Sequence, residues 1–92
     1  MLNVNLKTIS IHRKISFYLI LSYLYYELDE SLVSDGEFDD LCKDLLNNYE
    51  EVKNSNHIHK HLIDKFNLEC GTNIGTIYTN LIKSSAISLR NN

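Results

Sequence analysis

The sequence predicts an all-α protein, a small bundle of three to four helices built on a central helical hairpin. Proline is absent from the 92 residues and glycine occurs only three times, so few positions interrupt a helix. Several segments place apolar residues at intervals of three and four, which is the spacing of one face of an α-helix. A chain of this length has enough residues for one modest core. We therefore expect a single domain over 1–92, with a hairpin at about 9–53 and C-terminal helices at about 55–90.

The first predicted helix begins at a cap on Thr8 or Ser10 and continues to about Leu28. Apolar residues cover nearly all its sides, so we expect neighbours to pack on more than one face. The apolar run from Ile15 to Tyr26 has about twelve residues, whereas a helix that crosses a bilayer needs about twenty. This segment is therefore predicted to be a buried central helix, with no membrane contact.

The second predicted helix begins after Ser34. Ser34 and Glu37 have the spacing of a capping box, in which each side chain bonds the backbone N–H of the other residue. Apolar residues then recur at helical spacing, and the helix is expected to end at about Asn48 or Lys53.

The C-terminal part is expected to contain two more helices. A polar break at 53–56 precedes a short helix predicted over His57 to Phe66, and a loop follows from Asn67 to Asn73. The last helix would begin at a cap on Thr72 or Asn73 and end at about Leu89. The residues expected to face the core from the short helix are Ile58, Leu62, Ile63 and Phe66.

A group of aromatic and acidic residues lies where the two hairpin helices meet. Tyr25 and Tyr26 are at the end of the first helix, while Asp35 and Asp39 share one face of the second because they are four apart. The helix dipole alone can explain Asp35, which lies in the first turn, but explains Asp39 less well. Aromatic rings beside carboxylates are suited to hold a cationic ring and the hydroxyls of its sugar.

The stretch Tyr23 to Leu46 has the ordering Tyr-x-Tyr-(Tyr/His)-x-x-Asp-x-x-x-(Ile/Val)-x-Asp-x-Glu-(Tyr/Phe)-Asp-x-Leu. This ordering resembles the N-terminal Ia domain of bacterial NAD-dependent DNA ligases. In that family the small helical domain grips the nicotinamide mononucleotide half of NAD, while a separate nucleotidyltransferase domain carries out adenylation. The resemblance implies NAD or nicotinamide mononucleotide as ligand and the following binding residues: Tyr25, Tyr26, Asp35, Phe38 and Asp39.

The chain also departs from that family. Phe38 stands where the family usually has tyrosine, which removes a hydroxyl donor, and Ser31 stands where proline is frequent. No Lys-x-Asp-Gly occurs, so the nucleophile for an adenylated intermediate is missing, and no Gly-x-Ser-x-Gly or phosphate-binding glycine loop is present. We therefore expect a recognition module and not an enzyme, without catalytic residues.

The distribution of acidic residues along the chain limits the partners that it is expected to bind. Ten of the twelve acids lie between Glu27 and Glu51, which argues against binding to nucleic acid phosphates there.

One alternative to nucleotide recognition is a phage or mobile-element accessory protein that uses the same scaffold to bind and modulate a DNA ligase or another NAD-using enzyme. A second alternative is an ordinary helical hairpin, because tyrosines and leucines at helical spacing are usually core residues. The sequence gives no oligomeric state.

The histidines and cysteines give weaker evidence about metal binding and about the cellular compartment. His57 and His61 would share one face of a helix and are a possible metal pair, but no third ligand is evident, so we expect exposed histidines and no metal. Cys42 is expected to be structural. The two cysteines, Cys42 and Cys70, are interpreted as free thiols in a reducing compartment, and the polar N-terminus does not resemble a signal peptide. We therefore expect a cytoplasmic protein.

Overall fold

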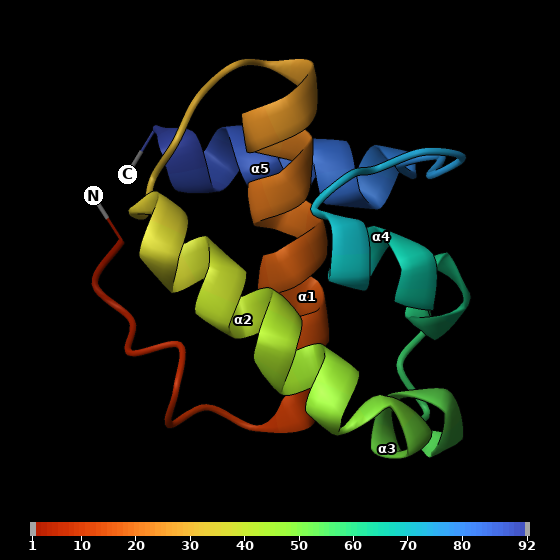
Figure 1. Ribbon diagram of the computed structural model, residues 1–92. Helices are drawn as coiled ribbons and strands as arrows, with labels where there is room; N and C mark the ends of the chain where they lie inside the picture. The colour runs from red at the N-terminus through yellow and green to blue at the C-terminus, as the bar shows by residue number, and fades with distance from the viewer. Residues whose placement is uncertain (1, 92) are drawn as a thin grey trace.

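A computed structural model describes residues 2–91, so positions 1 and 92 of the predicted domain lie outside the described residues. Within this range all regular secondary structure is helical, which confirms the predicted fold class. Helix α1 (Ile11–Ser22) stands in the middle of the molecule, α2 (Asp35–Asn47) crosses in front of it, and α5 (Asn80–Arg90) crosses behind it (Figure 1).

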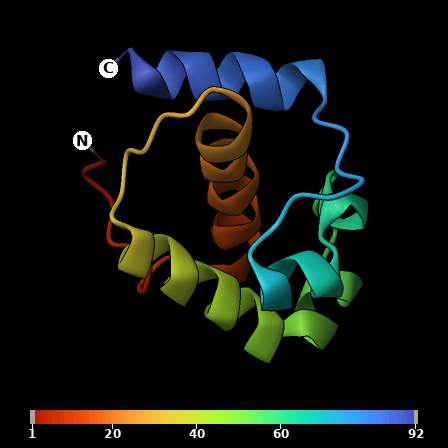
Figure 2. The ribbon, with the colours of Figure 1, turned by 45° about the horizontal axis from the view of Figure 1, so that its top comes forward.

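The shorter helices lie on the same side of α1 as α2 (Figure 2). Helix α3 (Tyr49–Asn54) follows α2 directly, and α4 (Lys65–Cys70) lies against α2. A view almost along α1 shows α5 on one side of it and α2, α3 and α4 on the other (Figure 2). The expectation of a central helix covered on more than one face is therefore confirmed.

Helix α1 begins where the sequence indicates. The Ser10 side chain caps it and accepts a hydrogen bond from the Arg13 backbone N–H at 3.2 Å. Ile15 and Leu19 are almost completely buried, and α1 contacts α2, α3 and α5. Burying such a side chain contributes about 1.5–3 kcal/mol, so these contacts hold the bundle together.

The end of the first helix is wider than an α-helix. Residues Tyr23–Glu27 form a π-helical turn, η1, with Leu28 as its C-cap. Asp29 then takes a left-handed conformation, with φ of 54°, and the Glu30 N–H donates to the Leu24 carbonyl at 2.8 Å. The helical segment therefore reaches Leu28 as predicted, but its last turn is one in which an extra residue is accommodated.

Helix α2 has the predicted capping box. The Glu37 N–H donates to Ser34 Oγ, and the Ser34 N–H donates to a Glu37 carboxylate oxygen, both at 3.1 Å. The helix ends at Asn47, after which α3 takes the chain on to Asn54. The two positions predicted for the end of the second helix, Asn48 and Lys53, therefore lie next to the ends of α2 and α3.

The prediction of an α-helix over His57 to Phe66 is wrong. Only a single 3₁₀ turn, η2 (Lys60–Leu62), forms there, and α4 begins at Lys65 with Asp64 as its cap. The His57 ring accepts a hydrogen bond from the His59 N–H at 3.0 Å, which occupies a donor in a local bond and favours a non-helical backbone.

The four residues expected to face the core from that helix therefore differ in burial. Ile63 is buried and Leu62 is half-buried, as expected. Ile58 and Phe66, by contrast, are 67% and 55% exposed.

The predicted start of the last helix is also wrong. Helix α4 extends into the expected loop as far as Cys70, and α5 begins only after its cap, Thr79. Gly75 has φ of 78°, a left-handed conformation that cannot belong to an α-helix. The buried Asn67 amide also donates to the Ile74 carbonyl at 3.0 Å, so a side chain fixes the segment between the two helices.

Replacement of Leu45 by alanine is expected to lower the free energy of unfolding by about 2–5 kcal/mol, because this fully buried side chain would leave a cavity in the core. Chemical denaturation followed by circular dichroism measures the loss. Leu46→Ala is the control, since Leu46 is only half-buried and should lose less. Equal losses for the two variants would contradict the described core.

Candidate functional site

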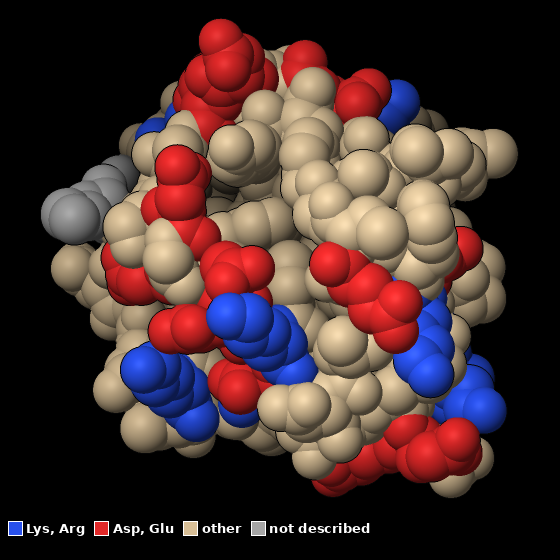
Figure 3. Space-filling model, viewed as in Figure 1, with Lys and Arg blue, Asp and Glu red and all other residues tan. Residues whose placement is uncertain are grey.

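The structure brings together the five residues that the sequence singles out as a binding site. They line one open depression of about 480 Å³ between η1 and α2, with Leu68 and Gly71 on its α4 side. The five residues are Tyr25, Tyr26, Asp35, Phe38 and Asp39. Acidic side chains gather over α2 on this face of the molecule (Figure 3).

The aromatic rings of the depression form a floor and one accessible edge. Phe38 is only 8% exposed, and its ring stacks between those of Tyr18 and Tyr25, with 5.8 Å between centroids in each pair. Tyr25 is 38% exposed, and its ring lies 4.9 Å from that of the half-buried Tyr26. A ligand would therefore meet Tyr25 first, while Phe38 supports the tyrosines from below.

The two carboxylates are exposed and differ in their partners. Asp35, in the first turn of α2, forms no ion pair with residues 2–91. Asp39 pairs with Lys43 one turn later at 2.9 Å, and this hydrogen bond raises the pKa of Lys43. An exposed pair of this kind contributes little to stability, so Asp39 is able to exchange Lys43 for another cation at small cost.

Cys42 lies at the bottom of the same depression and is buried, as expected of a structural cysteine. Burial, followed by the negative charge of Asp39, raises the pKa of its thiol to about 12. The thiol is therefore protonated at neutral pH and is not a nucleophile.

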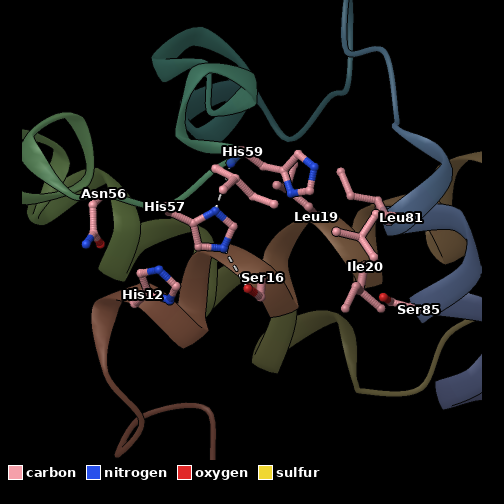
Figure 4. A pocket seen from close by; sticks show the side chains of 11 residues that line it. His12, Ser16, Leu19, Ile20, Asn56, His57, His59, Leu81 and Ser85 are labelled. Carbon is pink, nitrogen blue, oxygen red and sulfur yellow. Dashed lines mark hydrogen bonds between the residues drawn. The ribbon is translucent and has the colours of Figure 1, made fainter.

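A second concavity was not anticipated from the sequence. It has a volume of about 290 Å³ and lies between α1, the segment 56–59 and α5 (Figure 4). His57 and His59 are buried beside it, so the expectation of exposed histidines is wrong for these two and correct for His61. The His12 ring lies 4.4 Å from the His57 ring, centroid to centroid.

His57 and Ser16 form the contact that resembles a catalytic pair. The distance from His57 Nε2 to Ser16 Oγ is 2.7 Å, but His57 Nδ1 accepts a hydrogen bond from the His59 backbone N–H. An amide N–H can only donate, so Nδ1 has no proton and Nε2 carries it. A serine is activated by an unprotonated imidazole nitrogen, so in this tautomer His57 donates to Ser16 and does not activate it.

The environment of His57 also favours its neutral form. Burial lowers the pKa of His57, and the neighbouring His12 and His59 lower it further. The pKa of His59 is lowered by burial and by His61. Ser16 and His57 are 41 positions apart and belong to no motif, which is why sequence spacing does not reveal their contact.

The described residues also bear on metal binding and on membrane insertion. Across residues 2–91, no three His, Cys, Asp or Glu side chains are grouped so that they could hold a metal ion. None of the helices in this range is both long and apolar enough to span a bilayer.

Comparisons of the chain with protein-family models, with curated proteins and with solved structures give no match.

His57 makes the stability of the fold depend on pH. Because its pKa in the folded protein is below the ordinary 6.5, its contribution is complete above pH 6.5 and decreases as the pH falls below that value. We expect the free energy of unfolding to decrease between pH 7.5 and pH 5, and to decrease less in His57→Gln. Lys60→Gln, at an exposed neighbouring position, is the control and should keep the full decrease; an unaltered pH profile in His57→Gln would contradict the described environment.

Proposed function

We propose that this protein is a stand-alone recognition domain for the nicotinamide mononucleotide part of NAD. The observation that supports the proposal most directly is the convergence of Tyr25, Tyr26, Phe38, Asp35 and Asp39 on one depression. These are the positions at which the sequence resembles the Ia domain of NAD-dependent DNA ligases.

The chemistry of the depression fits the cationic nicotinamide ring. The exposed face of Tyr25 offers a surface for stacking, and a cation near an aromatic ring is attracted by the ring quadrupole. Asp35 and Asp39 supply negative charge and accept hydrogen bonds from ribose hydroxyls. Asp39 would exchange Lys43 for the ligand, whereas Asp35 has no ion pair within residues 2–91 to break.

In this proposal the domain binds but does not catalyse. The Cys42 thiol is protonated, and His57 is in the wrong tautomer to activate Ser16, so neither group in the two concavities is prepared as a nucleophile. We place the protein in the cytoplasm, where NAD is available and where free Cys42 and Cys70 remain reduced.

A specific observation supports a protein partner as a second function. Ile74 and Ile77, in the segment between α4 and α5, are 68% and 78% exposed. The same region of Figure 3 is a broad surface without charge, in contrast to the acidic face over α2. Exposed apolar surface of this kind often marks an interface, and we propose that it docks a DNA ligase or another NAD-using enzyme, as a phage or mobile-element accessory protein would do.

Nicotinamide mononucleotide is expected to bind and raise the melting temperature, whereas its reduced form, in which the ring is uncharged, should bind more weakly because Asp35 and Asp39 would lose their cation. Asp39→Asn and Tyr25→Leu should each weaken binding by about tenfold or more, measured by calorimetry. Asp40→Asn is the matched control, since Asp40 lies on the same helix and outside the depression. An absence of heat and of NMR shifts at millimolar nucleotide would refute the nucleotide proposal.

Fluorescence anisotropy of the labelled protein should rise when a purified NAD-dependent DNA ligase is added, and Ile77→Asp should reduce the rise because it puts a charge into the apolar surface. Glu51→Gln, on α3, is a control at an exposed position away from this segment. An equal rise with Glu51→Gln and Ile77→Asp would show that the ligase does not dock on the apolar surface.

A further inference from the structure

The concavity beside His57 has the features of a second, independent binding site. Its apolar floor is formed by side chains from α1 and α5, including Leu19, Ile20 and Ile82. Ile58 and Leu81 line it as well and are largely exposed, so apolar surface at this site remains in contact with water. At about 290 Å³ it is close to the lower limit of small-molecule pockets, which favours a ligand smaller than a typical drug.

The hydrogen bonds of Ser16 leave a donor for such a ligand. Because the His57 Nε2–H donates to Ser16 Oγ, the serine must direct its own hydroxyl proton elsewhere. No acceptor for that proton is found among residues 2–91, and the Ser16 side chain lines the concavity (Figure 4). A ligand that places an acceptor oxygen near Ser16 would complete this chain of hydrogen bonds.

The charge of the lining points to the kind of acceptor. None of the side chains that line this concavity, all within residues 2–91, is a carboxylate, whereas Asp35 and Asp39 line the depression between η1 and α2. Besides Ser16, the lining has donor groups in the Ser85 hydroxyl, the Asn56 amide and the His12 imidazole. In a protein with a net charge of −3, this is a concave surface where an anion meets donors and no nearby lining acid.

We propose that this concavity binds a small monocarboxylic acid with an apolar chain. The chain lies on Leu19, Ile20 and Ile82, and the carboxylate accepts a hydrogen bond from the Ser16 hydroxyl. This site does not depend on the nucleotide proposal, because none of the described residues lines both concavities.

Hexanoate is a suitable probe, with hexanamide as the neutral ligand of the same length. In a ¹H–¹⁵N NMR titration, hexanoate at millimolar concentration should shift the amides of Ser16, His57 and Ser85, and hexanamide should bind about tenfold more weakly, because a hydrogen bond to a charged acceptor is the stronger one. Shifts confined to other residues, or equal affinity for the two ligands, would overturn the proposal.

Two variants test the geometry. Ser16→Ala should weaken hexanoate binding about tenfold, but it also leaves the His57 Nε2–H without its partner and so has a cost in stability. Ser85→Leu avoids that cost, since it fills the concavity from α5 and should abolish binding while the protein remains folded by circular dichroism. Ser88→Leu, one turn further on α5 and outside the lining, is the matched control and should bind as the unaltered protein does; retained binding in Ser85→Leu would overturn the assignment.

Discussion

The structure depends on the burial of one helix from nearly all sides. Ile15, Leu19 and Leu24 are at most 1% exposed, and a helix with apolar residues around most of its circumference is stable only when neighbours exclude water from it. Helices α2, α3 and α5 provide this cover. The two concavities lie where this cover is incomplete: one is between η1 and α2, and the other is between α1, the segment 56–59 and α5. The requirement for a covered helix therefore also determines where a ligand can enter.

The hairpin was predictable because its determinants are local. Ser10 and Ser34 are capping residues beside the helices that they start, and the periodicity of the following apolar residues defines which face is buried. Beyond position 55 the backbone is directed by individual side chains, above all the His57 ring and the buried Asn67 amide. Such bonds leave no periodic pattern, so the sequence alone indicated a helix where the chain makes a 3₁₀ turn.

The residues of the candidate site could be predicted from the sequence, but the degree to which each is buried could not. The tyrosines and the carboxylates converge because a short connection joins η1 to α2, and the faces of both helices are evident from the sequence. The residues concerned are Tyr25, Tyr26, Asp35 and Asp39. The role of Phe38 was not evident, since its burial depends on the Tyr18 ring, which reaches it from the preceding helix. The second concavity could not be found in this way, because the Ser16–His57 contact beside it joins residues 41 positions apart.

The π-helical turn at Tyr23–Glu27 has a consequence for how this chain can vary in length. A π turn holds one residue more than the corresponding α-helical turn, so removal of one residue would allow regular α-helical hydrogen bonding to continue through it. The same deletion would leave the residues on either side facing as they do now, because a π turn absorbs its extra residue within itself. A shortened chain would keep its bundle, but the turn that loses a residue is the one that carries Tyr25 and Tyr26, which line the depression. The wide turn is therefore a place where a change of one residue in chain length alters the tyrosine wall of the depression and leaves the surrounding helices in position.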